Sequence, residues 1–305
     1  MVTAFGFQSF GGPEVGEFVE LDTPSPLPGE MLVEVRAAGV NPADWKIRSG
    51  LFPAPEPVHF PLVLGSEVSG VVREVGGDVE GFSVGDEVFG AVAPGSGGYT
   101  EMTLLTATGS AKKPVHVSFT DAATLTVAAA TGYDGVVQLG LTAGQTLLVN
   151  GASGGVGVAA AQIARDQGLT VIGIAGADKQ ALVESFGAIF VAYGDGVAER
   201  VAAIMPAVDA IFDLAGGAGL RAVAPLLADR TKLITAGDPA TAGELGGHPM
   251  QRDGSSRVLD IVAAMVADGK LDAKVEDILP LGKAAEALAA VEIGHAKGKV
   301  VIQVS

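Results

Sequence analysis

Four glycines in a short run, Gly151, Gly154, Gly155 and Gly157, have the spacing of a loop that holds phosphate groups. Residues without bulky side chains let a pyrophosphate approach the backbone, and the first N–H groups of a following helix point at it with the positive end of the helix dipole. The candidate diphosphate-binding residues are therefore Ala152, Ser153, Gly154, Gly155 and Val156. Ala152 stands where the first glycine of the G-x-G-x-x-G pattern is usual. Taken alone, the run is therefore also compatible with an ordinary tight turn that binds no phosphate.

The residues on both sides of the glycines favour the phosphate-binding interpretation. Thr146–Asn150 is a short aliphatic run typical of a buried strand, Val158–Gln167 has a helical pattern that Gly168 ends, and Thr170–Ala175 is a second β-rich run. Strand, glycine turn, helix and strand form one βαβ unit of about thirty residues, which is the context that a dinucleotide-binding turn requires.

Composition limits the class of protein. The chain has 305 residues, 48% of them hydrophobic and 18% charged, which is enough for two globular domains. It contains no cysteine, so disulfides and thiolate chemistry are excluded. The net charge of −16 disfavours nucleic acids and anionic membranes as partners. With no signal-peptide pattern and no apolar stretch long enough to span a bilayer, we expect a cytoplasmic enzyme.

The pattern of elements changes near Asp121. Residues 1–120 are rich in proline, glycine and short β-type runs, among them Met31–Ala37, Val68–Val75 and Val84–Val92, which predicts a small β-barrel-like domain. From Asp121 onward helices and strands alternate with short connections, which predicts a parallel, doubly wound sheet.

Individual elements follow from the same reading. A helix begins at about Asp121, with Thr120 near its N-cap and a break at Thr131–Gly132. Residues 237–256 are polar and rich in turns. Later elements are expected as helices at Ala181–Phe186, Ala198–Met205, Leu220–Leu227, Arg257–Asp268 and Leu281–Glu292, and as strands at Ile189–Ala192, Ala210–Leu214, Lys232–Ala236 and Lys299–Val304.

Several stretches, in their order and spacing, resemble one family. They are GVNPADWKIRSG (Gly39–Gly50), PLVLGSEVSGVVREVG (Pro61–Gly76), FSVGDEVFG (Phe82–Gly90), ATGYDGV (Ala130–Val136), the glycine run, and GHAKGKVVIQV (Gly294–Val304). The chain resembles the zinc-less medium-chain dehydrogenases/reductases, the zeta-crystallin-like quinone oxidoreductases. The resemblance implies an α/β protein with a GroES-like β-barrel catalytic domain at 1–120 and 269–305, reached again by the C-terminal tail, and a doubly wound Rossmann NADP-binding domain at 121–268. It also implies a homodimer.

The positions that bind zinc in metal-dependent relatives carry other residues here. By the resemblance, Asn41 stands at the cysteine position, Ser66 at the histidine position, and the third ligand falls near Val127, while Glu67 and Asp44 remain. A zinc site needs three protein N, S or O ligands and an open position. We therefore predict no catalytic metal, and no structural zinc either, because the loop Ala91–Gly98 is short and cysteine is absent.

The cofactor is predicted to be NADP(H). An NAD site commonly has an acidic residue at the end of its second strand, where this chain has Ala175 followed by Gly176. Lys179 could pair with a 2′-phosphate, although Asp178 weakens the local field and a solvated lysine at a helix start is the alternative. Tyr193 matches a tyrosine that contacts the 2′-phosphate in similar quinone reductases. By the same resemblance Ala236 and Gly237 back the nicotinamide ring, and Thr131 lies near it.

Without a metal the predicted site delivers hydride but has no Lewis acid. Quinones and α,β-unsaturated carbonyls, small hydrophobic electrophiles, need only hydrogen-bond donors. Asn41 is the candidate contact to the ribose or to the substrate carbonyl, and Asp44 is interpreted as fixing Asn41 and its loop. Tyr99 is interpreted as a packed tyrosine, so solvent is left to supply the second proton.

Two further questions stay open in the sequence. His248 lies in the polar segment that could face the site, and Lys297 and Lys299 are read as surface lysines or, alternatively, as contacts to cofactor phosphates. The leading function is an NADPH-dependent reductase of quinones or enones. The alternatives are an enoyl-thioester reductase, disfavoured because this acidic chain shows no basic entry patch, and a low-turnover NADPH-binding redox sensor or regulator.

Overall fold

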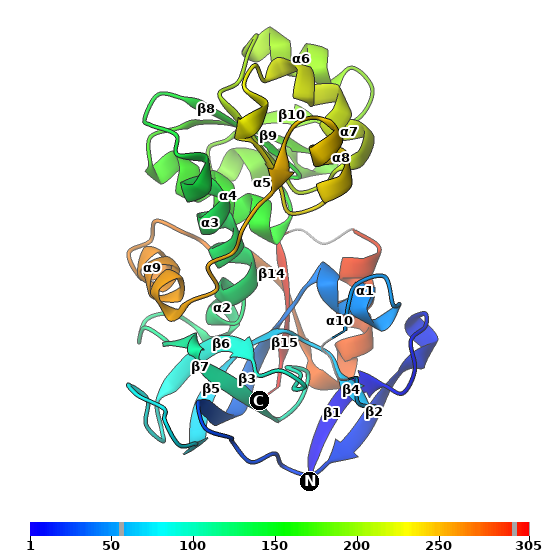
Figure 1. Ribbon diagram of the computed structural model, residues 1–305, viewed down its shortest axis with the longest axis vertical. Coiled ribbons are helices and arrows are strands. Elements are labelled where there is room, and N and C mark those ends of the chain that lie inside the picture. The colour runs from blue at the N-terminus through cyan, green and yellow to red at the C-terminus, as the bar shows by residue number, and fades with distance from the viewer. Residues whose placement is uncertain (55–57, 295–297, 305) are drawn as a thin grey trace. The chain divides into compact units, whose positions relative to one another are not determined.

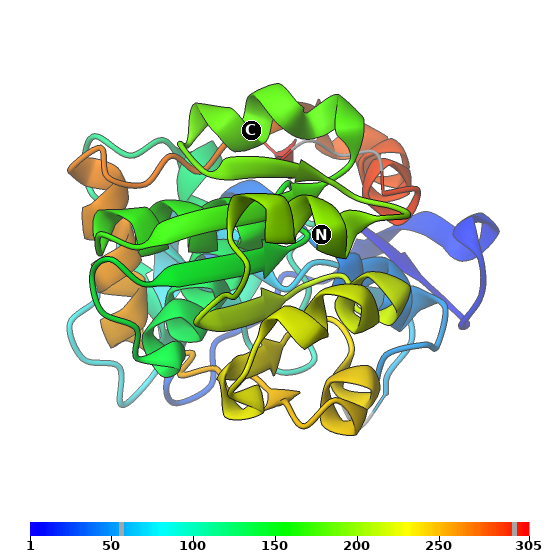
Figure 2. The same ribbon diagram turned by 90° about the horizontal axis from the view of Figure 1, so that it is seen from above.

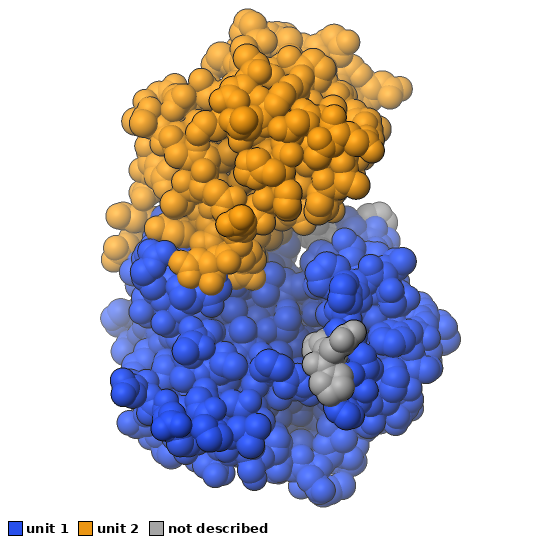
Figure 3. Space-filling model, in the orientation of Figure 1, with its two compact units in different colours: residues 1–127, 254–267, 274–305 blue, residues 128–253, 268–273 orange. Residues whose placement is uncertain are grey.

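The computed structural model describes residues 1–54, 58–294 and 298–304, which form two compact units (Figure 3). Unit 1 comprises Met1–Val127, Gly254–Ala267 and Lys274–Ser305, and unit 2 comprises Ala128–Asp253 and Asp268–Ala273. This division differs from the expected boundaries at Asp121 and Gly269. Helix α9 (Ser256–Ala267) packs against strand β7 (Met102–Lys112) of unit 1 (Figure 1), because its apolar side carries Val258, Leu259 and Val262, which are all buried.

A closed ring of strands forms the body of unit 1. Strand β3 (Glu30–Val40) pairs on one side with β5 (Glu67–Val75) and on the other with β7, and β6 (Glu87–Val92) joins β5 to β7, so these four strands close into a barrel. A separate three-stranded sheet has the order β2–β1–β4, with β1 at Val2–Phe7, β2 at Gly16–Leu21 and β4 at Leu62–Val63. The predicted β-barrel-like domain is confirmed.

The C-terminal tail returns to this barrel, as the resemblance implied. Strand β15 (Lys299–Gln303) pairs antiparallel with β3, and β14 (Val275–Pro280), which the sequence did not predict, lies parallel to β15. Helix α10 (Ala284–Glu292) places Ala287 and Leu288 in the same apolar core as Met31 and Val300. The tail therefore contributes both to the sheet and to the core of unit 1.

The remaining helices of unit 1 are short. They are α1 (Pro42–Arg48), α2 (Phe119–Ala122) and two 3-10 turns, Pro13–Val15 and Leu281–Lys283. The N-cap of α2 is Ser118, whose hydroxyl accepts the Asp121 N–H at 3.0 Å, and Thr120, which was expected near the cap, lies two residues further on.

Unit 2 is built on a six-stranded sheet in which every pair is parallel, in the order β10–β9–β8–β11–β12–β13. Its strands are β8 (Thr146–Asn150), β9 (Thr170–Ala175), β10 (Ile189–Ala192), β11 (Ala210–Asp213), β12 (Leu233–Thr235) and β13 (His248–Pro249). The predicted doubly wound sheet is confirmed. The chain runs outward from β8 to β10 and then crosses to β11, so the switch point of the sheet lies between β8 and β11.

Helices cover both faces of this sheet (Figure 2). They are α3 (Ala130–Leu139), α4 (Gly155–Asp166), α5 (Gln180–Ser185), α6 (Val197–Ile204), α7 (Gly217–Val223) and α8 (Pro239–Glu244), with 3-10 turns at Ala177–Lys179, Ala224–Leu226 and Arg230–Lys232. Helix α8 and strand β13 fall in the segment expected to be only polar turns. The reversal of strand order requires α4 and α5 on one face and α6 and α7 on the other, since each parallel crossover is right-handed.

The predicted helix break at Thr131–Gly132 was wrong. Helix α3 runs through both residues, and the irregular turn is a π-helical segment, Leu125–Ala129, just before it. Gly132 has a packing role instead, because a Cβ built there would lie 2.8 Å from the Ala160 nitrogen of α4. The glycine lets the two helices approach closely.

Gly157 provides a test of how tightly the glycine turn is packed. A Cβ at this position would lie 2.3 Å from the Gly151 carbonyl oxygen and 2.7 Å from the Ala152 Cα, both backbone atoms. We expect Gly157→Ala to lower the free energy of unfolding by about 1–3 kcal/mol, the usual cost of overpacking, as measured by urea unfolding.

The matched control is Gly243→Ala in α8, where a Cβ would meet no atom within 4 Å. That change should leave stability unchanged or raise it by about 0.4–1 kcal/mol, since alanine restricts the unfolded chain. Equal unfolding midpoints for the two variants would contradict the close approach of α4 to the turn.

Candidate functional site

The glycine turn joins β8 to α4 at the switch point of unit 2. Gly151 has a φ of +96°, a conformation that favours glycine, and Gly154 caps α4 in an extended conformation. The Gly151 and Ala152 N–H groups both donate to the Ile174 carbonyl, at 3.0 and 2.9 Å, and so attach the turn to β9. Of the predicted diphosphate contacts, Ala152 therefore has its N–H already engaged, and its side chain is fully buried.

The structure explains why alanine can replace the first glycine of the pattern. Gly173 lies opposite on β9, and a Cβ built there would come 2.9 Å from the Ala152 Cβ. The missing side chain at Gly173 provides the space that the Ala152 methyl group fills. The departure from G-x-G-x-x-G is thus compensated on the neighbouring strand, a pairing that sequence spacing does not show.

The start of α4 fits a diphosphate. Helix α4 has 12 residues, and its first N–H groups lack partners within the helix. Gly154 is exposed, and a Cβ there would meet only the Gly151 oxygen, at 3.8 Å. Ser153, Gly155 and Val156 are partly exposed around it. Four of the five predicted residues therefore surround an open helix N-terminus, where an anion is stabilised.

The residues expected near a 2′-phosphate follow β9 and β10. Gly176 is exposed directly after β9. Tyr193 follows β10, the residue is 57% exposed, and its N–H donates to the Ala175 carbonyl at 2.7 Å. The alternative of a solvated Lys179 was wrong, because only 8% of this residue is exposed and its Nζ lies 3.3 Å from the Asp178 carboxylate. A phosphate would compete with this carboxylate for the ammonium group.

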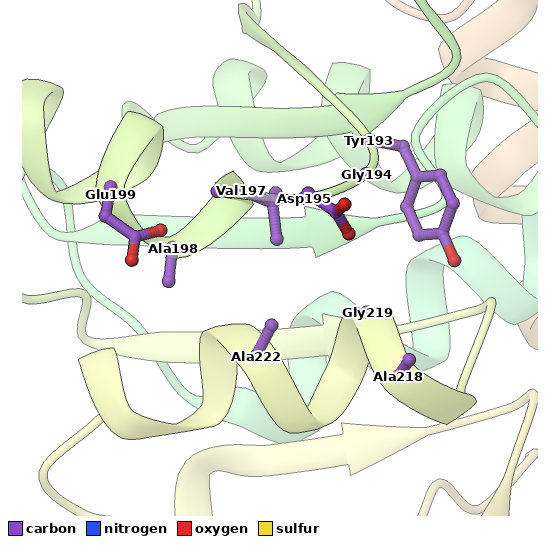
Figure 4. Close-up of a pocket in the computed structure, with 10 residues that line it drawn as sticks. Tyr193, Gly194, Asp195, Val197, Ala198, Glu199, Ala218, Gly219 and Ala222 are labelled. Atoms are coloured by element: carbon purple, nitrogen blue, oxygen red, sulfur yellow. The ribbon is translucent and has the colours of Figure 1, made fainter.

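A pocket of about 410 Å³ lies beside Tyr193 in unit 2. It is bordered by the start of α6 and by α7, whose Ala222 faces Val197 and Ala198, while Ala218 lies at the same end as the Tyr193 ring (Figure 4). The Asp195 and Glu199 carboxylates also line it. A Cβ at Gly219 would lie 2.9 Å from this ring, so the glycine leaves the ring its place. The volume is in the range of small-molecule sites.

A buried hydrogen-bond network ties the carboxyl ends of three strands together, and sequence reasoning missed it. The Asp213 carboxylate ends β11, accepts the Asn150 amide at 2.7 Å and the Gly216 N–H at 2.9 Å, and accepts the Thr235 hydroxyl at 2.6 Å. All three side chains are at most 1% exposed. The available signal was a polar residue at the last position of β8, β11 and β12.

This network also shapes the segment predicted to back the nicotinamide. The Thr235 hydroxyl oxygen accepts the Gly237 and Asp238 N–H groups, each at 3.0 Å, so the turn after Ala236 is held in place. Gly237 has no room for a side chain, because a Cβ would lie 2.8 Å from the Leu214 carbonyl carbon. At Gly237 the absence of a side chain is therefore required by packing.

Two further predicted residues of unit 2 are Thr131 and His248. Thr131 is buried in the first turn of α3. His248 is exposed on the edge strand β13, and its ring nitrogens lie 3.2 Å from the carbonyl oxygens of Pro249 and Thr231. Because β13 is the strand farthest from β10 in the sheet order, His248 is not part of the switch-point site of unit 2.

In unit 1, Asn41 and Asp44 meet at the start of α1. Asn41 is the N-cap residue and Pro42 follows it, a combination that favours a helix start. The Asp44 carboxylate accepts the Asn41 N–H at 2.8 Å and the Tyr99 hydroxyl at 2.7 Å. Tyr99 is fully buried, and this arrangement suits the interpretation of Asp44 as a residue that fixes the loop.

A second cluster brings together residues far apart in the chain. The Glu67 carboxylate accepts the Asn41 amide at 2.8 Å, the Lys299 ammonium at 3.0 Å and the Val127 N–H at 2.8 Å. Lys299 also donates to the Val40 carbonyl at 3.1 Å and to Asn41 Oδ1 at 2.7 Å. Lys299 is only 4% exposed, so its expected surface position was wrong. Lys297 lies outside the described residues.

This cluster does not fit a zinc ion. Asn41, Glu67 and Val127 meet here, but the Lys299 ammonium group already lies among the oxygen atoms of this cluster. A divalent cation there would be repelled by Lys299 and would find no histidine or thiolate. Within residues 1–54, 58–294 and 298–304, no three His, Cys, Asp or Glu side chains form a group that could hold a metal.

Comparisons with known proteins agree with this architecture. Residues 27–125 match the model of the alcohol dehydrogenase GroES-like domain, and residues 186–302 match that of the zinc-binding dehydrogenases. The human NAD(P)H oxidoreductase RTN4IP1, mitochondrial, is 31% identical over 91% of this chain and 82% of its own. The chloroplast envelope quinone oxidoreductase homolog of Arabidopsis thaliana is 30% identical over 99% of this chain and 98% of its own.

The chain belongs to the quinone oxidoreductases of the medium-chain dehydrogenase/reductase family. The quinone oxidoreductase of Coxiella burnetii superimposes with a TM-score of 0.92 at 28% identity, covering 100% of this chain and 99% of that one. That of Escherichia coli, solved in complex with NADPH, superimposes with a TM-score of 0.86 at 26% identity, covering 99% of both chains.

As a family member the chain is an oxidoreductase with a nicotinamide cofactor, and its fold is a GroES-like domain with a Rossmann-type sheet. In the described part of the chain, no helix has both the length and the apolar character needed to span a bilayer. Because these relatives are named for the mitochondrion and the chloroplast envelope, a cytoplasmic location stays a prediction.

The buried Asp44 carboxyl predicts a pH dependence of stability. Burial raises its pKa from 3.8 to about 6, against the lowering effects of the Tyr99 and Asn41 hydrogen bonds and of Lys299. The folded chain therefore binds more protons than the unfolded chain between these values, so the contribution of Asp44 is fully present below about pH 4 and is lost as the pH rises through about 6.

We expect the wild type to lose about 2 kcal/mol of unfolding free energy relative to Asp44→Asn between about pH 4.5 and about pH 7.5, measured by urea unfolding. Asp229→Asn is the control, because hydrogen bonds to Thr231 lower the pKa of Asp229 and keep it ionised throughout this range. A wild-type curve parallel to that of Asp44→Asn would contradict the raised pKa.

Proposed function

We propose that this chain is an NADPH-dependent reductase that transfers hydride to quinones or α,β-unsaturated carbonyls without a metal ion. The observation that carries the proposal is the open N-terminus of α4 after the glycine turn, at the switch point of a parallel sheet. Further support comes from the relatives named as quinone oxidoreductases and from the Escherichia coli relative solved with NADPH.

The cofactor assignment follows from residues at the strand ends of unit 2. Ser153, Gly154, Gly155 and Val156 would hold the diphosphate, and Ala236 and Gly237 would lie against the nicotinamide. When bound, the reduced dinucleotide supplies the hydride. Gly176 leaves space for a 2′-phosphate where an NAD site commonly has an acidic side chain, and the exposed Tyr193 hydroxyl would donate to it.

The pocket beside Tyr193 supports the same orientation of the cofactor. Its volume of about 410 Å³ accommodates a purine, and the alanine, glycine and valine residues of its walls suit a flat ring, while Asp195 and Glu199 add two carboxylates to the lining. The adenosine end would therefore lie at Tyr193, with the diphosphate at α4 and the nicotinamide toward Ala236.

Metal independence is supported by the chemistry of the Asn41 cluster. Since the Lys299 ammonium occupies the centre of that cluster, polarisation of the substrate falls to hydrogen-bond donors, and the Asn41 amide is our candidate. Acceptors that are already electrophilic need no stronger activation. Asp44 and Tyr99 are buried and bonded to each other, so we assign the second proton to solvent.

Two properties are proposed from the resemblance and composition alone. The substrate would be a small hydrophobic electrophile, and the chain would form a homodimer. The alternative functions are an enoyl-thioester reductase and an NADPH-binding redox sensor. The following experiment distinguishes both from the proposed quinone or enone reductase.

The experiment combines a substrate panel with one substitution in the glycine turn. We expect steady-state oxidation of NADPH with quinones and enones, and little turnover with enoyl-CoA thioesters. Gly154→Glu should raise the Kd of NADPH at least about tenfold, because a carboxylate would occupy the anion site at the start of α4.

Gly154→Ala is the matched control, and it should change the Kd no more than about twofold because only the Gly151 oxygen is near. Tight NADPH binding without turnover would support the sensor, and preference for the thioester would support the enoyl reductase. Equal Kd values for wild type and Gly154→Glu would place the diphosphate elsewhere.

Cofactor preference has a separate test in Tyr193→Phe. Loss of a hydroxyl that donates to a charged phosphate should raise the Kd of NADPH about tenfold and leave that of NADH unchanged, as measured by fluorescence titration. Tyr133→Phe in α3 is the control and should alter neither value. A parallel change for both cofactors would remove Tyr193 from 2′-phosphate recognition.

A further inference from the structure

Lys299 and Glu67 form a buried ion pair whose purpose the proposed function does not yet explain. Glu67 is 0% exposed and Lys299 4%, and a charge removed from water in this way is costly unless it is paired and hydrogen-bonded. A pair of apolar side chains would fill the same volume at less cost. The two charges therefore need a reason beyond packing.

The contacts of Lys299 account for all of its donors. Its three N–H groups match three oxygen atoms, the Val40 carbonyl at 3.1 Å, Asn41 Oδ1 at 2.7 Å and Glu67 Oε1 at 3.0 Å. The ammonium group therefore has no donor left for a ligand. Whatever Lys299 does for a reaction, it does through one of these partners.

The ion pair determines which way the Asn41 amide points. An ammonium group only donates, so the Asn41 atom 2.7 Å from Lys299 is the amide oxygen, and an ionised carboxylate only accepts, so the atom 2.8 Å from Glu67 is the amide nitrogen. Amide orientation is normally ambiguous, but two partners of opposite polarity leave one solution. Asn41 is 4% exposed, and among the described residues its second amide N–H has no hydrogen-bond partner, so this N–H is the group that it can still donate.

We propose that Lys299 and Glu67 are positioning residues that hold Asn41 as a hydrogen-bond donor to the carbonyl oxygen of the hydride acceptor. This inference rests on the proposed reductase function. A donor at that oxygen stabilises the negative charge that develops there as hydride is transferred. With the amide reversed, Asn41 would present its own oxygen and repel the same charge.

The fold explains how Lys299 reaches Asn41 from the other end of the chain. Strand β15 pairs antiparallel with β3 so that Val300 lies opposite Val40, which brings the preceding Lys299 beside Asn41. Glu67 begins β5, which pairs with β3 on its other side. Asn41 thus directly follows β3, the strand that pairs with both β15 and β5.

The test compares Lys299→Met with Asn41→Leu and with the double variant, using the full chain and a series of quinones of different reduction potential. Lys299→Met should lower kcat at least about tenfold and leave the Kd of NADPH within about twofold. The loss should be larger for weakly electrophilic quinones, because they depend more on the donor. The double variant should lose no more activity than Asn41→Leu, since Lys299 acts through Asn41.

Lys113→Met is the matched control, because Lys113 is another buried lysine of unit 1, bonded to the Val117 carbonyl at 2.7 Å and paired with Glu87 at 2.9 Å. It should leave the dependence on quinone potential unchanged. If Lys299→Met does not fold, Glu67→Gln/Lys299→Met removes both charges and should show the same steeper dependence.

The outcomes separate this inference from the function on which it rests. Absence of NADPH binding or quinone reduction in the wild type would overturn the proposed function. An active wild type with an equally active Lys299→Met, or with losses that add in the double variant, would overturn the positioning role alone.

Discussion

The contact between the Lys299 ammonium and the Glu67 carboxylate is the constraint on which unit 1 depends. Through the two side chains it joins the end of β3, the start of β5, the segment at Val127 and the first residue of β15. Each of these segments contributes a polar group that would otherwise be buried without a partner. Removing either charge would leave the other in an apolar barrel, which is far more costly than never burying the pair.

Unit 2 also buries polar side chains, and there they are paired by hydrogen bonds around one carboxylate. The carboxyl ends of β8, β11 and β12 carry Asn150, Asp213 and Thr235, and Asp213 accepts hydrogen bonds from both neighbours. The two oxygen atoms of the Asp213 carboxylate accept the hydrogen bonds from these side chains, and one of them also accepts the N–H of Gly216 in the following loop. The loops at this edge of the sheet are therefore shaped before any ligand binds, which reduces the ordering that binding requires.

The sequence predicted the elements whose information is local. The βαβ unit from Thr146 to Ala175, the β-rich first part and the alternation after it appear as expected, because hydrophobic period and glycine placement report on short stretches of chain. Expectations failed where a partner lay far away in sequence. Strand β14 has the weakly apolar sequence VEDILP, and it is a strand because β15 pairs with it.

Helix α9 shows the same limit at the level of domains. Its amphipathic pattern was plain, but the pattern does not say which apolar surface it covers, and the structure places it on β7. Ala152 shows the same limit for a single residue. Its methyl group fits in the turn because Gly173, on the next strand, has no side chain in that space. In each case the deciding information is a contact between residues distant along the chain.

The sequence by itself determined the family, the glycine turn between β8 and α4 and the absence of cysteine, because these are properties of residue type and short-range spacing. Only the tertiary structure decided the polarity of the Asn41 amide, the burial of Lys179 and Lys299, and the tie between Asn150, Asp213 and Thr235. Burial and hydrogen-bond partners arise when strands pair in a particular register, and that register is set by the packing of the whole unit.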